Sequence, residues 1–97
     1  MIRNYKNQGT EDIAKGLNSS AARSVLPVEL HPHARRRLLA LQAAGSIEDL
    51  RSIRGNRYHR LERARRGQHS IAVNNQYRIC FDWVDTDAKN VEIVDYH

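Results

Sequence analysis

The sequence has 97 residues, 40% of them hydrophobic, so we expect one domain spanning residues 1–97, with a modest core and little room for an enclosed ligand cavity. Its net charge of +5 makes a polyanion the first partner to consider, with nucleic acid ahead of a membrane surface. A single cysteine, Cys80, excludes an intrachain disulfide and a metal site built from cysteines.

The beginning of the chain predicts a short strand from Ile2 to Tyr5 and then a helix. Thr10 is followed by Glu11 and an aspartate, a pattern typical of an N-cap with acidic residues in the first helical turn, and the helix is expected to end near Gly16. Residues 17–24 are small and polar without periodicity, so we interpret them as a connection. The first twelve residues lack the apolar stretch of a secretory signal, and no segment is apolar enough to cross a bilayer, so we expect a cytoplasmic protein with no membrane partner.

A second helix is predicted where Pro32 suits a first-turn position and apolar residues recur at spacings of three or four. The recurring residues are Ala34, Leu38 and Leu41. Arg35, Arg36 and Arg37 then lie across its outer side. Gly45 is expected to close this helix, and Ser46 with Asp49 three residues later indicates one further capped turn through Leu50.

From Tyr58 onward the hydrophobic period changes to two, which predicts strands. The expected strands cover residues 59–62, 68–73, 76–84 and 90–96. Asn74 and Asn75 tolerate positive φ and suit a tight turn, and residues 85–87 suit another. The order is therefore β-α-α-β-β-β-β, an α+β fold with a mainly antiparallel sheet packed against two N-terminal helices, whose other face is left free for a substrate.

The third of these strands has two faces of different chemistry. Tyr77, Ile79, Phe81 and Trp83 alternate with Arg78, Cys80 and Asp82. One face is apolar, and Arg78 is expected to point to the opposite side of the sheet.

Arginine dominates the basic residues. Seven arginines lie between Arg51 and Arg66, where Glu62 is the only acid. Guanidinium binds phosphate oxygens through a planar fork and stacks on bases, so this region favours a phosphodiester partner. The alternative is a solvated surface whose arginines reflect the base composition of the genome.

Cleaving RNA without a metal requires a base for the 2′-hydroxyl, an acid for the departing 5′-oxygen, cations for the phosphate and a group that places the nucleotide. The chain offers candidates for all four, namely His97, His59, Arg78, Arg65, Tyr96 and Asp95. Three alternatives remain open: residues 96 and 97 are a frayed end, His59 is an ordinary strand histidine, or Arg78 forms a structural ion pair with Asp82 or Asp95.

Other chemistries find little support in the sequence. Asp82, Asp85 and Asp87 cluster in a predicted turn but lack the glycine and distal glutamate of a calcium loop. No glycine-rich phosphate loop and no Gly-x-Ser-x-Gly motif occurs. We therefore expect neither a metal nor a cofactor.

Four segments together resemble the HigB-type toxins, also called plasmid maintenance killer proteins, of the RelE superfamily. The segments are residues 57–61, 65–71, 75–83 and 91–97. The resemblance implies a RelE-like fold, cleavage of messenger RNA in the A site of the small ribosomal subunit with contacts to ribosomal RNA, and neutralisation by a HigA-like helix-turn-helix antitoxin. Operator DNA would be a partner indirectly, through that antitoxin.

The resemblance also assigns roles to individual residues. Arg78 matches the family's strand arginine, and Asp95, Tyr96 and His97 match its terminal catalytic group. His59 falls where some members have a functional histidine, and Arg65 matches the basic residue before the glycine. The chain departs from the pattern at Glu62, where several members have a lysine.

Our interpretation is that His97 is the general base or acid, Tyr96 and Asp95 position it and the substrate, Arg78 and Arg65 hold the scissile phosphate, and His59 assists. Further RNA contacts are expected from Arg57, Arg60, Arg63, Arg66, Arg35 and Arg36. Two other hypotheses remain: a non-catalytic RNA- or ribosome-binding module, and a weakened toxin that acts mainly in a complex of antitoxin and operator DNA.

Overall fold

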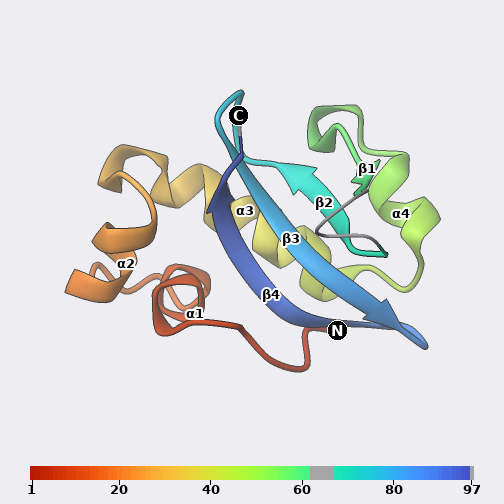
Figure 1. The fold of residues 1–97 in the computed structure, drawn as a ribbon, viewed down its shortest axis with the longest axis horizontal. Helices are drawn as coiled ribbons and strands as arrows, with labels where there is room; N and C mark the ends of the chain where they lie inside the picture. The colour runs from red at the N-terminus through yellow and green to blue at the C-terminus, as the bar shows by residue number, and fades with distance from the viewer. Residues whose placement is uncertain (62–66, 97) are drawn as a thin grey trace.

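The computed structural model describes residues 1–61 and 67–96, in which helices cover one side of an antiparallel sheet with strand order β1-β2-β3-β4 (Figure 1). The α-helices are α1 (Gln8–Ala14), α2 (Ser20–Val25), α3 (His31–Ala43) and α4 (Ile47–Arg51), with 3-10 turns η1 (Val28–Leu30) and η2 (Arg54–Asn56). The strands are β1 (His59–Arg60), β2 (His69–Ala72), β3 (Tyr77–Val84) and β4 (Asp87–Asp95). The predicted α+β class and mainly antiparallel sheet are confirmed.

The first residues lie beside β4 but form only isolated parallel bridges, at Ile2 and at Tyr5, so the prediction of a continuous strand was wrong. The reason lies between the bridges, where the side chain of Asn4 replaces a backbone acceptor and takes the hydrogen bond of the Asn90 N–H at 3.0 Å. Asn90 has φ 53°, which turns β4 locally out of regular strand geometry.

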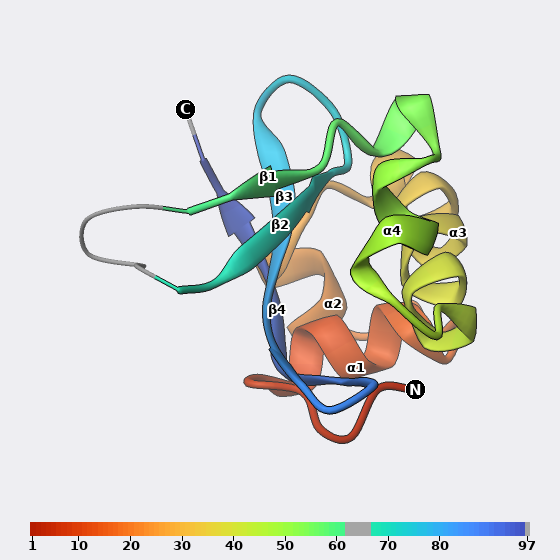
Figure 2. The ribbon, with the colours of Figure 1, turned by 90° about the vertical axis from the view of Figure 1, so that its right-hand side faces the viewer.

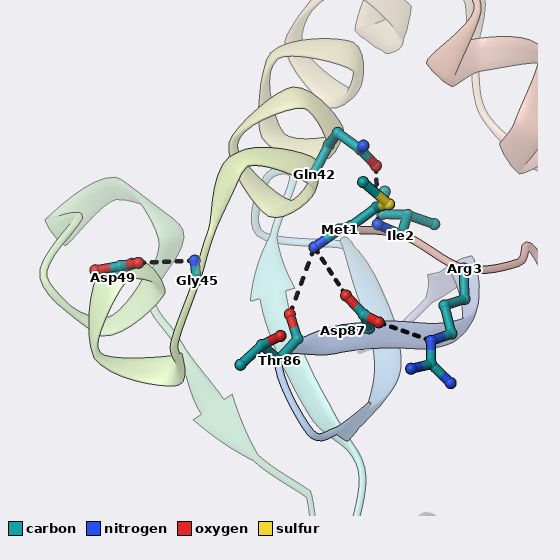
Figure 3. A network of polar contacts seen from close by, with 8 residues as sticks. All are labelled: Met1, Ile2, Arg3, Gln42, Gly45, Asp49, Thr86 and Asp87. Atoms are coloured by element: carbon teal, nitrogen blue, oxygen red, sulfur yellow. Dashed lines mark hydrogen bonds and ion pairs between the residues drawn. The ribbon is translucent and has the colours of Figure 1, made fainter.

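Polar contacts fasten this segment to the β3–β4 turn (Figure 3). The Arg3 Nε donates to Asp87 at 2.7 Å, and the amino group of Met1 lies 3.4 Å from the same carboxylate. The Ile2 N–H donates to Gln42 of α3 at 2.8 Å. The hydrogen bond from Arg3 lowers the pKa of Asp87, because it favours the ionised carboxylate.

Helix α1 begins three residues earlier than predicted. Its N-cap is Asn7, whose side chain accepts from the Thr10 N–H at 2.9 Å, so the prediction of Thr10 as the cap was wrong. Thr10 is fully buried instead, and its Oγ1 accepts the N–H of Ile93 at 3.1 Å. That bond ties α1 to β4.

Residues 17–24 do not form a simple connection, since α2 occupies most of them. Ser19 caps α2 by accepting the Ala22 N–H at 3.0 Å, and its hydroxyl donates to Asp12 at 2.5 Å. At Gly9 of α1 an added Cβ would lie 2.4 Å from the carbonyl oxygen of Ala21. A helix this short is marginal alone and depends on close tertiary packing rather than on a periodic apolar stripe, so residues 20–25 carry no local pattern that predicts it.

The predicted helices α3 and α4 are confirmed, but Arg37 is half-buried and donates to Asn56 instead of lying on the outer side of α3 with Arg35 and Arg36. Ala34, Leu38 and Leu41 of α3 are buried and belong to the same core cluster as the sheet residues Ile79 and Phe81. Before α4, Ser46 accepts the Asp49 N–H at 3.3 Å, and the Asp49 carboxylate accepts the N–H of Gly45 at 2.8 Å (Figure 3).

Strands β1, β2 and β3 are shorter than predicted, whereas β4 begins three residues earlier than predicted, at Asp87, and ends at Asp95. The two-faced character of β3 is confirmed. In the turn after β2, Asn74 does not use positive φ; its side chain accepts the N–H groups of Gln76 and Tyr77 at 2.9 and 2.7 Å. The second turn does contain a left-handed residue, Asp85 with φ 59°. Among the helices of residues 1–61 and 67–96, none combines the length and the hydropathy that a membrane span requires.

Candidate functional site

The side of the sheet turned away from the helices carries Arg78, and we call it the Arg78 face. Register places His59 opposite Ser70, Ser70 opposite Cys80, and Arg78 opposite Val94, so these side chains share that side. In Figure 2 the helices lie to the right of the sheet, whereas the β1–β2 ribbon and the end of β4 project to the left. These two projections flank the Arg78 face.

Two hydrogen bonds hold the Arg78 guanidinium in place. Its Nε donates to the Ser70 hydroxyl at 2.7 Å, and Nη2 donates to the carbonyl oxygen of Arg57 at 2.5 Å. Ser70 is fully buried and donates to the carbonyl oxygen of His59 at 3.4 Å. Within the described residues neither bond uses Nη1, so this edge of the guanidinium is available to an external acceptor.

Partial burial is the main cause that lowers the pKa of Arg78, and the nearby charge of Arg57 acts in the same direction. Cys80 and Tyr96 oppose this effect, which places both groups within electrostatic reach of the guanidinium. An arginine so shifted still carries its charge at neutral pH. The Arg78 face therefore presents a cation whose orientation is fixed before any ligand arrives.

Among residues 1–61 and 67–96 no ion pair includes Arg78, so the structure does not have the alternative of a structural ion pair with Asp82 or Asp95. Asp82 accepts a hydrogen bond from Asn90 at 2.8 Å, and Asp95 accepts one from Gln76 at 3.0 Å. Both contacts are to amide groups.

Arg57 supports the site through its backbone. It ends η2 with φ 43°, a left-handed conformation that costs an arginine about 1–2 kcal/mol. The neighbouring Asn56 is fully buried, where its side chain donates to the Leu50 carbonyl at 3.0 Å and accepts from Arg37 at 2.9 Å. These bonds hold the strained turn that directs the Arg57 carbonyl toward Arg78.

The end of β4 divides the predicted terminal group between the two sides of the sheet. Asp95 stands opposite Tyr77, so alternation places it on the helix side, whereas Tyr96 follows on the side of Arg78. The Tyr96 N–H donates to the Gln76 carbonyl at 2.7 Å, which fixes the backbone there, and its side chain is 40% exposed. The alternative of a frayed end is therefore wrong for residue 96.

The two residues of β1 also point in opposite directions. His59 is exposed on the Arg78 face, whereas Arg60 stands opposite His69, whose ring lies on the helix side and stacks on Phe81 with centroids 5.7 Å apart. The Tyr58 hydroxyl is 2.5 Å from Nδ1 of His69. This aromatic contact holds β1 against β2 from the side opposite the candidate site.

Other predicted residues lie elsewhere. Arg35 and Arg36 are exposed on α3, so the sheet separates them from Arg78. The predicted roles of His97, Arg65, Arg63, Arg66 and Glu62 fall on positions outside the described residues.

Sequence reasoning overlooked Ser70 and the backbone role of Arg57. Alternation along β2 could have placed Ser70 beside Arg78, but no pattern indicated the left-handed turn at Arg57. Within the described ranges the structure has no group of three or more His, Cys, Asp and Glu side chains placed to hold a metal ion.

A helix-backed antiparallel sheet of this kind is consistent with the α+β fold of RelE-like toxins. The family model described as "RelE-like toxin of type II toxin-antitoxin system HigB" matches residues 11–97, so the chain belongs to the HigB-like toxin family. Toxin HigB-1 of Vibrio cholerae serotype O1 (strain ATCC 39315 / El Tor Inaba N16961) is 49% identical over 55 residues. That match covers 57% of this chain and 58% of the Vibrio toxin, and the predicted family resemblance is confirmed.

Proposed function

We propose that this protein is a ribosome-dependent messenger RNA endoribonuclease that acts in the cytoplasm without a metal ion, inhibits translation and growth, and is neutralised by a HigA-like antitoxin. The observation that carries the proposal is the orientation of the Arg78 guanidinium, which is fixed by hydrogen bonds to the Ser70 hydroxyl and the Arg57 carbonyl oxygen. Tyr96 lies within electrostatic reach of the same guanidinium. A preorganised cation of this kind stabilises charge that develops on a phosphate in the transition state.

In the proposed reaction the 2′-oxygen attacks the adjacent phosphorus, and the bond from phosphorus to the 5′-oxygen breaks. The products are a 2′,3′-cyclic phosphate and a free 5′-hydroxyl. His97 and His59 supply the base that removes the 2′-proton and the acid that protonates the leaving oxygen. Arg78, with Arg65, balances the charge on the phosphate, and Tyr96 stacks on or hydrogen-bonds the nucleotide.

Asp95 has an indirect role in this proposal. Because it lies on the helix side and accepts a hydrogen bond from Gln76, it positions the end of β4 rather than the substrate. The RNA backbone would be bound by Arg57 together with Arg63 and Arg66, which predicts binding that weakens as salt rises. Arg60 points to the other side of the edge strand β1, so it would contact only RNA that passes around that edge. Arg35 and Arg36 lie on the other layer and cannot contact the same phosphate.

The test compares Arg78→Ala with Arg23→Ala, a matched loss of charge on α2. On purified ribosomes programmed with messenger RNA, we expect Arg78→Ala to slow cleavage about 100-fold or more, the usual effect of removing one transition-state donor. Co-sedimentation should show nearly unchanged ribosome affinity. A parent protein that never cleaves, with parallel loss of ribosome affinity in Arg78→Ala, would instead identify a binding module.

The second candidate function is a weakened toxin that acts mainly with its antitoxin on operator DNA. Glu62, at a position where several family members have lysine, is the feature that favours it. If the Glu62 carboxylate slows RNA cleavage, Glu62→Lys should raise the cleavage rate. An unchanged rate would show that other cations already balance the phosphate charge.

A further inference from the structure

A second surface feature lies in the helical layer, away from the Arg78 face. It is a pocket of about 290 Å³ between the end of α1, η1 and the first turns of α3. Its lining is mainly apolar and includes Ile13, Leu17, Val28 and Pro32, with Arg35 beside them. We call it the α1–α3 pocket.

The α1–α3 pocket exposes apolar side chains that the fold has not covered. Leu17 is 52% exposed and Val28 is 46% exposed, whereas Ile13 at the base is buried. Single exposed apolar residues are ordinary, but two of them around one hollow mark a place where another apolar group fits. The volume is near the lower end of small-molecule pockets, roughly 300 Å³, and so suits one or two inserted side chains.

Arg35 gives the pocket a fixed positive charge. Its Nε donates to the carbonyl oxygen of Ala14 at 3.3 Å, which holds the guanidinium over Gly16. Gly16 has φ 77°, and an added Cβ there would lie 3.3 Å from the Arg35 Cζ, so glycine suits both the backbone and the close approach. Among the described residues no ion pair includes Arg35, so both terminal amino groups can bind a carboxylate of another molecule.

We propose that the α1–α3 pocket is the docking site of the antitoxin, and that it receives an acidic amphipathic segment whose apolar side chains insert beside Leu17 and Val28 while a carboxylate pairs with Arg35. The inference rests on the antitoxin partner of the proposed function. Charge complementarity selects this occupant, because a net positive toxin with an oriented arginine at an apolar hollow attracts an acidic segment and repels a second copy of itself.

The location has a mechanistic consequence. α3 packs on the opposite side of the sheet from Arg78, so antitoxin docking and RNA cleavage use different surfaces. Substitutions can therefore remove one function and keep the other.

The experiment measures the Kd of the purified toxin for its purified antitoxin by calorimetry, in an Arg78→Ala background that permits expression. We expect Val28→Asp and Arg35→Glu each to raise the Kd at least tenfold, a change of about 1.4 kcal/mol. Val84→Asp is the matched control, since Val84 is a similarly exposed valine, 42%, on the β3–β4 turn, and it should change the Kd less than twofold. Circular dichroism melts confirm that each variant is folded.

Three results would overturn the inference: equal Kd values for Val28→Asp and Val84→Asp, loss of ribosome binding in Val28→Asp with antitoxin binding intact, or a toxin dimer that Val28→Asp dissociates. Cleavage is scored separately with Val28→Asp carrying the native Arg78, which should cut RNA in the presence of antitoxin. A protein that binds antitoxin through the pocket but cuts no RNA would support the docking site and contradict the proposed function.

Discussion

The two faces of the sheet are stabilised by different forces. On the helix side, Ile71, Ile79 and Phe81 are completely buried against α3 by apolar contacts, which act in no particular direction. On the Arg78 face, the groups that matter are placed by directed hydrogen bonds, above all through Ser70. Apolar packing thus determines where the sheet lies, whereas a few polar bonds determine where its charge points.

The strongest loss of stability is expected from a substitution on the helix side of the sheet. Phe81→Ala should lower the free energy of unfolding by about 3–5 kcal/mol, because it removes a fully buried ring from the core. Cys80→Ala, one residue away on the Arg78 face, should lower it by about 1 kcal/mol because it removes a single heavy atom. Urea titrations of both variants measure the difference, and similar losses would mean that the two faces are packed alike.

A smaller effect is expected from the polar anchor of the Arg78 face. Ser70→Ala should cost about 1–2 kcal/mol of unfolding free energy, since Arg78 loses a buried hydrogen-bond partner. The same variant should cleave RNA about ten times more slowly, because the guanidinium is no longer oriented. Ser24→Ala on α2, which also removes one hydroxyl, serves as the control and should leave cleavage unchanged. Full cleavage by Ser70→Ala would show that Arg78 needs no anchor.

The smallest effect concerns pH and His69. Burial is the main cause that lowers the pKa of His69 below its usual 6.5, so the folded state favours the neutral ring. The stabilisation is thus fully present above pH 6.5 and is lost as the pH falls through the folded-state pKa. As the pH is lowered from 8 to 5, the urea concentration at the midpoint of unfolding should fall less in His69→Phe than in the parent protein. A parallel decline in both proteins would assign the pH dependence to other groups.

Periodicity predicted the parts of the fold that apolar burial determines. The spacing of Leu38 and Leu41 located α3, and alternation along β3 placed Arg78 on the face away from the helices. Helix α2 escaped prediction because Ser19 and Gly9 stabilise it through contacts with α1 rather than through an apolar stripe.

The candidate site was predictable only in part. Arg78, His59 and Tyr96 share a face as alternation requires, but Asp95 falls on the other side because successive residues of a strand point in opposite directions. The support from Arg57 depends on a left-handed turn held by buried Asn56, and no local pattern signals such a tertiary contact.

We propose that RNA is cut on the Arg78 face and not on the helical layer. The most direct test measures kcat/KM for cleavage on programmed ribosomes with Arg78→Ala and Arg35→Ala, which remove the same charge from opposite sides of the sheet. We predict a loss of about 100-fold or more for Arg78→Ala and less than twofold for Arg35→Ala. Equal losses, or a larger loss for Arg35→Ala, would contradict the assignment.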